Sequence, residues 1–215
     1  MVSAEIISGK KGRESISRKD DIKKKLDTRE RIIKTALSII GERGDMNITV
    51  REISRKAQVN LASINYYFRS KKRLFNEIEE YFANETNNIT SILDNSDIDA
   101  MARILTWAKK LMENLVNYPG IMLLFASKIL RGEKIDKTIS KFVNIKNSSF
   151  KKSIGEITGI TDSKLVDLKA IQIFSGLINP LIIQYGVGKV FNVDFNNSKT
   201  RDKYIETLIG SILGS

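Results

Sequence analysis

The chain has 215 residues, of which 41% are hydrophobic, so it can form a small domain plus a larger one, or a single large domain. Only two prolines are present, and strand-like alternation is almost absent, which predicts an all-α fold. Histidine and cysteine are both missing, which excludes disulfides, thiolate zinc sites and histidine or cysteine catalysis. No acidic motif singles itself out as a carboxylate metal site or a catalytic centre. We therefore expect neither an enzyme nor a metal site, and no cofactor.

The sequence offers no sign of a membrane span or a signal peptide. No run approaches the roughly 18 apolar residues that a span requires, and the first residues lack an apolar middle. These observations predict a cytoplasmic protein without a membrane partner.

The formal net charge of +11 is concentrated near the N-terminus. Residues 1–72 contain 18 Lys/Arg and 9 Asp/Glu, whereas residues 73–215 contain 18 and 16. A basic module attached to a nearly neutral body indicates a polyanionic partner, because Lys and Arg displace counterions from a phosphate backbone. The alternative is a basic segment that only interacts with solvent.

The first elements in chain order are a basic arm and a helix. Residues 1–26 combine Gly, Ser and many charges, and the arm could add DNA contacts through Lys23, Lys24 and Lys25. Asp27 and Glu30 form a capping-box pattern that opens a helix with apolar residues at helical spacing, and Gly44 closes it.

Three further caps predict three more helices. Thr49 with Glu52 starts a helix that ends near Lys56, and Asn60 is an N-cap for residues 61–68. Ser70 is an N-cap for a longer helix over about 71–90. We assign residues 27–72 to one domain on this pattern.

Longer helices follow and form the second predicted domain, residues 73–215. Their expected ranges are about 98–117, a helix begun by Pro119, 135–157, 163–185 and 199–213. Pro180 should kink or interrupt the apolar segment 163–185.

Residues 49–68 have the layout of a helix-turn-helix. Ile53 and Ala57 occupy the first helix, Val59 the turn, and Ile64 and Phe68 the second helix. This leaves the outward face of residues 61–66 free to enter a major groove, where base edges are distinguishable.

The segment from about 28 to 82 resembles the TetR family of bacterial regulators. One departure is Gln58, which stands where the family usually places glycine; a left-handed conformation there costs roughly 1 kcal/mol. The matching residues are Gly44, Ile48, Thr49, Ile53, Ala57, Val59, Ile64, Tyr67, Phe68, Ser70, Lys71, Leu74 and Phe75.

The resemblance implies roles in DNA binding. Asn65 is suited to pair with adenine, Leu61 or Ala62 to touch a thymine methyl, and Lys71 to bind phosphate at a helix N-terminus. Tyr67 could instead be mainly a core residue, and Arg51 a solvated surface charge. The full set of expected DNA contacts is Thr49, Arg51, Leu61, Ala62, Ser63, Asn65, Tyr66, Tyr67 and Lys71.

The second domain is expected to form a homodimer and to bind an effector. One helix-turn-helix reads too few bases, so two copies should bind a palindromic operator with recognition helices about 34 to 36 Å apart, or at a longer related spacing. The expected interface residues are Phe174, Leu177, Ile178, Leu181, Tyr204, Ile205, Leu208 and Ile212. The alternative is that both terminal helices are only intramolecular core.

A candidate pocket for a small apolar or aromatic effector is lined by Trp107, Leu111, Met122, Phe125, Phe142 and Phe174. By family default, the effector relieves repression by changing the separation of the recognition helices through the helix at 71–90. Two alternatives remain: an architectural DNA-binding protein of the same fold without an effector, and an all-α enzyme.

Overall fold

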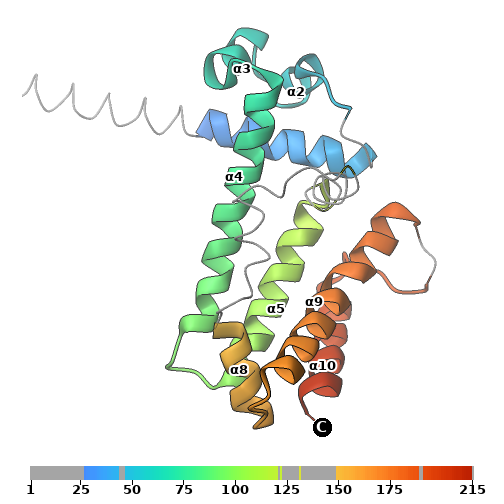
Figure 1. Ribbon diagram of the computed structural model, residues 1–215. Helices are drawn as coiled ribbons and strands as arrows, with labels where there is room; N and C mark the ends of the chain where they lie inside the picture. The colour runs from blue at the N-terminus through green and yellow to red at the C-terminus, as the bar shows by residue number, and fades with distance from the viewer. Residues whose placement is uncertain are drawn as a thin grey trace, which may run out of the picture.

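The computed structural model describes residues 27–43, 47–120, 122, 131, 149–188 and 191–214. Within these ranges the chain is helical and contains no strand, which confirms the predicted all-α class (Figure 1). The elements are a helix over residues 27–43, α2 (Val50–Lys56), α3 (Leu61–Phe68), α4 (Lys71–Thr90), a 3-10 turn (Ser91–Asp94), α5 (Ala100–Asn117), α8 (Ser149–Thr158), α9 (Ser163–Gly186) and α10 (Ser198–Leu213).

The molecule is elongated, and α4 runs along much of its length. In Figure 1, α2, α3 and the helix at 27–43 form one end, whereas α8 and the C-terminus lie at the other. Below the N-terminal end, α5 packs against α4, α8, α9 and α10, and α9 packs against α10. The chain therefore joins a small helical head to a larger helical body through α4.

Three of the predicted N-caps are confirmed. The side chains of Thr49, Asn60 and Ser70 accept hydrogen bonds from the backbone N–H groups of Glu52 (3.2 Å), Ser63 (2.8 Å) and Arg73 (3.2 Å). Each bond satisfies one of the donors left open in a first helical turn. The boundaries of α2, α3 and α4 consequently follow from the local sequence.

Several predicted features lie outside the described residues. They are the arm at 1–26 with Lys23, Lys24 and Lys25, the cap Gly44, the part of the expected helix 135–157 before residue 149, and the pocket residues Phe125 and Phe142.

The helix at 27–43 supplies much of the core of the head. Its residues Ile32, Ala36, Leu37 and Ile40 have no exposed surface, and Ile33 is 2% exposed. They share one hydrophobic cluster with residues of α2, α3 and α4, among them Ile53 and Phe68. This burial fixes α2 and α3 on the head, because exposing each of these isoleucine and leucine side chains would cost about 1.5 to 3 kcal/mol.

The same helix meets the body at two glycines. A Cβ atom on Gly120 would lie 2.6 Å from the Leu37 carbonyl oxygen and 2.8 Å from the Gly41 nitrogen. A Cβ atom on Gly41 would lie 2.7 Å from Pro119 Cγ. The backbones of the two segments approach so closely that neither position has room for a side chain.

Polar contacts connect the helix at 27–43 to α4. Tyr81 of α4 donates a hydrogen bond to Glu30 Oε1 of this helix (3.3 Å). Within the helix, Lys34 forms an ion pair with the same carboxylate (2.6 Å). Burial raises the pKa of Tyr81 to about 12. The hydrogen bond to Lys34 lowers the pKa of Glu30, and Arg29 pairs with Glu77 of α4. The head and α4 are therefore held together by charge as well as by apolar packing.

Pro180 does not interrupt α9, which runs continuously from Ser163 to Gly186. Proline has no N–H group, so the carbonyl four residues earlier, that of Gly176, loses its helical donor. The Tyr204 hydroxyl of α10 donates to this carbonyl at 2.7 Å. A Cβ atom on Gly176 would lie 2.7 Å from Leu208 Cδ1, so α9 and α10 pack closely here. The hydroxyl of a neighbouring helix thus replaces the missing backbone bond.

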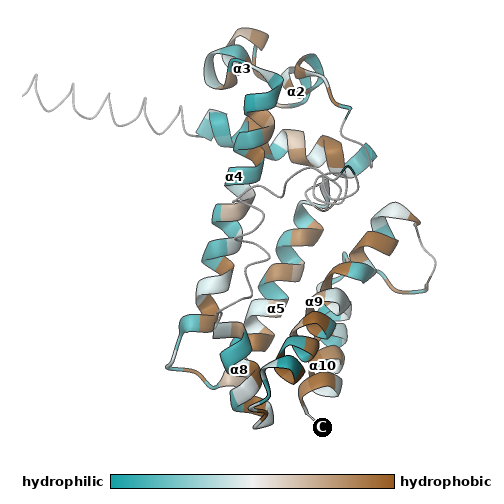
Figure 2. Ribbon diagram, in the orientation of Figure 1, coloured by the Kyte–Doolittle hydropathy of each residue, from teal (hydrophilic) through white to brown (hydrophobic). Residues whose placement is uncertain are grey.

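Helix α9 is apolar on more than one side. Among the described helices it alone is long and apolar enough to cross a membrane, although only 28% of its most apolar window is buried. Figure 2 shows that its C-terminal half is largely hydrophobic. Length and composition are weak evidence for a span, because the core helix of a soluble protein passes the same test. The exposed apolar side chains of α9 require another explanation, which is proposed below.

We predict that Gly120→Ala lowers the free energy of unfolding by about 1 to 3 kcal/mol, because the added methyl overlaps the backbone of Leu37 and Gly41. Gly186→Ala is the matched control, since a Cβ atom there meets nothing within 4 Å. Urea unfolding monitored by circular dichroism measures both changes. Equal stability of the two variants would contradict the close packing.

Candidate DNA-binding site

The turn between α2 and α3 is held by hydrogen bonds across it. The Ser54 hydroxyl donates to the Val59 carbonyl at 2.6 Å, and the Val59 N–H donates to the Ser54 carbonyl at 3.1 Å. Ala57 is 3% exposed and Val59 packs against the core. The sequence analysis did not identify Ser54. Its only sign in the sequence is a small hydroxyl residue on α2, five residues before Val59 in the turn.

Gln58 has a φ of 54°, so the turn does adopt the left-handed conformation that glycine favours. Arg69, at the end of α3, has a φ of 58°. Neither residue is glycine, and each such conformation costs an L-residue roughly 1 kcal/mol. The helix-turn-helix therefore keeps its geometry at a local cost.

The outward face of α3 is exposed. Ile64 and Phe68 are each 1% exposed and anchor the inner face. Four residues expected to contact DNA lie on the outer face: Leu61, Ala62, Asn65 and Tyr66. Their spacing of one, four and five residues places them on one side of the helix. The structure brings these four side chains together.

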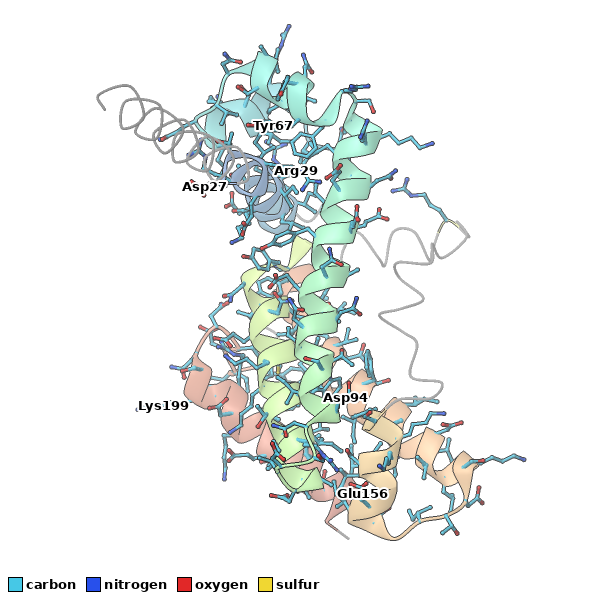
Figure 3. The ribbon with its side chains drawn as sticks, turned by 90° about the vertical axis from the view of Figure 1, so that its left-hand side faces the viewer. Asp27, Arg29, Tyr67, Asp94, Glu156 and Lys199 are labelled. Atoms are coloured by element: carbon cyan, nitrogen blue, oxygen red, sulfur yellow. The ribbon has the colours of Figure 1, made fainter. Side chains whose placement is uncertain are left out.

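Two other expected contacts on α3 are only half-buried. The Tyr67 ring packs against the core, with its centroid 5.3 Å from that of Tyr66 and 6.2 Å from that of Phe68. The Ser63 N–H is used in the Asn60 cap. Figure 3 shows Tyr67 at the end of the molecule opposite Glu156. Tyr67 therefore has a packing role, as the alternative interpretation allowed.

The remaining expected contacts flank α3. Arg51 and Lys71 are exposed, and the Lys71 Nζ atom lies 5.7 Å from the centre of the Phe75 ring. Thr49 is exposed, but its hydroxyl and N–H both contact Glu52 Oε2, at 3.2 and 3.0 Å. Thr49 is therefore first a helix cap.

Positive charge surrounds α3. Residues 47–73 contain seven Lys/Arg, and Glu52 is their only acidic residue. The hydrogen bond from the Thr49 backbone, together with Arg43, lowers the pKa of Glu52. Lys56 lies 2.6 Å from Glu42 Oε2 and lowers the pKa of Glu42. The carboxylates of Glu42 and Glu52 are already paired with cations. The excess positive charge around α3 therefore comes from Arg51, Lys71, Lys72 and Arg73. The sequence analysis did not single out Lys72 and Arg73, although they directly follow Lys71.

The expected effector-pocket residues form packed core where the structure describes them. Trp107 is 3% exposed, and its ring centroid lies 4.6 Å from that of Phe150 and 6.0 Å from that of Phe174. Leu111 and Met122 are 1% and 8% exposed. In the single chain, the rings of Phe150 and Phe174 pack around Trp107, and Leu111 and Met122 are buried in the core.

The expected dimer interface needs a correction. Leu177, Leu181 and Ile205 have no exposed surface in the single chain, so they belong to its core and cannot present a surface to a second copy. Because α9 is apolar on more than one side, sequence periodicity did not distinguish its inner face. Another five expected interface residues are half-buried against that core: Phe174, Ile178, Tyr204, Leu208 and Ile212. The exposed apolar residues of α9 are Leu165, Leu168, Ile171 and Ile182.

Comparison with known proteins yields matches to bacterial regulators. Residues 32–78 match the family described as "Bacterial regulatory proteins, tetR family". The probable HTH-type transcriptional regulator YttP of Bacillus subtilis (strain 168) is 36% identical over 58 residues, which are 27% of this chain and 28% of that protein. The sequence match thus covers much less than two thirds of the relative.

Solved structures extend the likeness to the body. A TetR-like regulator from Rhodococcus sp. RHA1 has a TM-score of 0.62 at 10% identity over 87% of this chain and 97% of that chain. A mutant of HlyIIR, a hemolysin II transcriptional regulator, has a TM-score of 0.63 at 21% identity over 89% and 100%. At such identities the likeness shows a shared fold.

A helix-turn-helix with an exposed, cation-flanked second helix, carried on a helical body, defines the class of helix-turn-helix regulators. Within that class, residues 32–78 match the TetR family model, which confirms the resemblance stated from the sequence.

We predict that Gln58→Gly raises the free energy of unfolding by about 1 kcal/mol, because glycine adopts a positive φ without the Cβ clash. Arg55→Gly, at an exposed helical position of α2, should lower it by about 1 kcal/mol. Thermal unfolding checks both signs. A destabilised Gln58→Gly would show that the turn is not strained.

Proposed function

We propose that the protein is a DNA-binding transcriptional regulator that binds a palindromic operator as a homodimer and is released by a small apolar or aromatic effector. The observation that carries the proposal is the outer face of α3. It displays Leu61, Ala62, Asn65 and Tyr66 on a helix whose inner face is fully buried.

The chemistry of this face suits a major groove. An amide such as that of Asn65 can bond both N6 and N7 of adenine, and Leu61 or Ala62 can contact a thymine methyl. The cations on α2 and at the start of α4 supply phosphate contacts, which set orientation and affinity without reading sequence. Two fully buried anchors, Ile64 and Phe68, hold the helix in place.

We predict that Asn65→Ala weakens binding to the protein's own upstream DNA by about 1 to 3 kcal/mol, with little effect on a shuffled fragment. Lys71→Ala should weaken binding to both fragments and reduce the salt slope by about 1. Fluorescence anisotropy across a salt series measures both. The matched controls are Asn88→Ala, on an exposed position of α4, and Lys152→Ala on α8, whose side chain is 78% exposed. Failure to bind either fragment contradicts the proposal.

A homodimer explains the exposed apolar side chains of α9. Leu168 and Ile171 are 56% and 60% exposed, and Leu165 and Ile182 are 48% and 42% exposed. Several exposed apolar side chains along one helix indicate an interaction site, and a second copy would cover them isologously. We propose this exposed surface as the interface in place of Leu177, Leu181 and Ile205, which the sequence analysis had chosen and which are buried in the core.

We predict that Leu168→Glu weakens dimerisation by at least about tenfold, because a charge would be buried in an apolar interface. Ile98→Glu is the control, since Ile98 is an exposed apolar residue outside α9 and α10. Sedimentation equilibrium measures the association. Unchanged association of Leu168→Glu would show that this face of α9 is not the interface.

The alternative without an effector also has an observation in its favour. The rings of Trp107, Phe150 and Phe174 pack together where an effector was expected. An architectural DNA-binding protein would keep the same operator affinity in the presence of apolar ring compounds, and the anisotropy assay distinguishes the two.

A further inference from the structure

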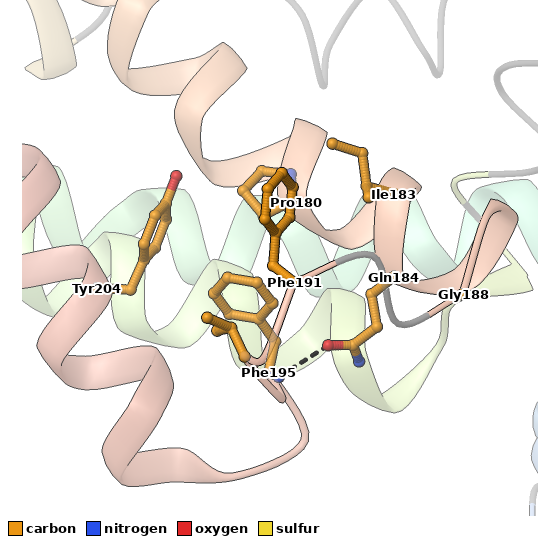
Figure 4. Close-up of a pocket in the computed structure, with 8 residues that line it drawn as sticks. Pro180, Ile183, Gln184, Gly188, Phe191, Phe195 and Tyr204 are labelled. Atoms are coloured by element: carbon orange, nitrogen blue, oxygen red, sulfur yellow. Dashed lines mark hydrogen bonds between the residues drawn. The ribbon is translucent and has the colours of Figure 1, made fainter.

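A cavity lies at the corner between α9 and α10, away from the packed rings around Trp107. It has a volume of about 240 Å³ and opens to solvent. Figure 4 shows residues of three segments around it: the end of α9, the connection that follows, and the start of α10. The lining residues, called here the α9–α10 corner, are Pro180, Ile183, Gln184, Gly188, Phe191, Val193, Phe195 and Tyr204.

Hydrogen bonds on both sides of Phe195 fix one wall of the corner. The Phe195 N–H donates to Gln184 Oε1 at 2.8 Å, and Arg201 Nη1 donates to the Phe195 carbonyl at 2.7 Å. Phe195 is 7% exposed, and its ring meets Tyr204 edge-on, with centroids 5.2 Å apart. The part of the wall formed by Phe195 is therefore held in place by hydrogen bonds to both neighbouring helices.

Most polar groups of this wall are already paired, but the buried Gln184 Nε2 has no hydrogen-bond partner among the described residues. The Tyr204 hydroxyl donates to the Gly176 carbonyl at 2.7 Å, and the backbone groups of Phe195 are bonded to Gln184 and Arg201. Among the described residues, no charged side chain lines the corner. These residues offer an occupant aromatic and aliphatic surface and one amide donor, so the complementary chemistry is apolar and uncharged.

The corner also displays apolar surface that is costly to leave in water. Phe191 is 65% exposed and Val193 is 42% exposed. An occupant would cover part of both. An apolar cavity of about 150 Å³ is known to hold benzene, so the larger volume here has room for two fused rings.

We propose that the α9–α10 corner is a binding site for a small uncharged apolar compound of one or two rings. The site is separate from the interior around Trp107, where an effector was expected from the sequence. It touches Pro180 and Tyr204, which also hold α9 against α10. This part rests on the proposed function: the effector of that proposal would bind at the corner and act directly on α9 and α10.

The experiment is a fluorescence titration of the full chain with N-phenyl-1-naphthylamine, an uncharged ring probe that brightens in apolar surroundings. Wild type should bind it saturably, one probe per chain. Phe191→Ala removes an exposed wall and should weaken binding about five- to tenfold. Val187→Ala is the matched control, because Val187 is 72% exposed in the same connection but does not line the corner.

A filling variant tests the same site from the opposite direction. Val193→Trp should abolish saturable binding, whereas Val187→Trp should leave it unchanged. Both changes fall on exposed residues, so circular dichroism and Tm should match wild type. Leu168→Ser, on the exposed face of α9, is the control for adsorption. It should lower probe binding only if the probe binds to that face of the helix and not to the corner.

The outcomes separate the two proposals. Absence of saturable binding, equal binding by Phe191→Ala and Val187→Ala, or loss of binding only in Leu168→Ser would overturn the corner site. Loss of dimerisation in Phe191→Ala, measured by sedimentation, would also overturn it, because a second copy would then be the occupant. The titration contains no DNA, so failure of the DNA-binding proposal leaves its result intact. Weaker DNA binding in the presence of the probe, absent in Val193→Trp, would support both.

Discussion

The burial of the helix at residues 27–43 is the contact on which the rest of the structure depends. Its apolar face forms the floor under α2 and α3, and its Gly41 lies directly against Pro119 and Gly120 of the body. The same helix makes both contacts, so a movement of this helix changes its packing against α2 and α3 and against the body together. The direction in which α3 points is therefore determined by how this helix sits on the body, with α4 as the second connection.

The local structure of the head was predictable because it depends on short-range chemistry. The caps at Thr49, Asn60 and Ser70 are side-chain to backbone bonds within three residues, and such bonds are readable from sequence. At Gln58 the family pattern gave the cost of a left-handed turn but left open whether the turn is strained or altered, and the structure shows the left-handed conformation. The close approach at Gly41 and Gly120 joins residues far apart in the chain, and no local pattern reports it.

The body was harder to predict because its signals are ambiguous. Helix α9 is apolar on several faces, so the buried Leu177 and the exposed Leu168 carry the same hydropathy signal. Only the positions of α5, α8 and α10 separate the inner face from the outer one. The α9–α10 corner includes the connection between the two helices, where residues such as Phe191 and Phe195 have no helical periodicity to reveal them.

The bond from Tyr204 to the Gly176 carbonyl determines how α9 and α10 can move. Only the residue four positions before Pro180 offers a vacant carbonyl, so the hydroxyl has a single partner at this point. Sliding α10 by one helical turn, about 5.4 Å, would break that bond and move Leu208 away from the notch at Gly176. These contacts favour movement of the two helices as one unit. In the proposed dimer, a change in the spacing of the two recognition helices would then come from tilting this unit or from the joint at Gly41 and Gly120.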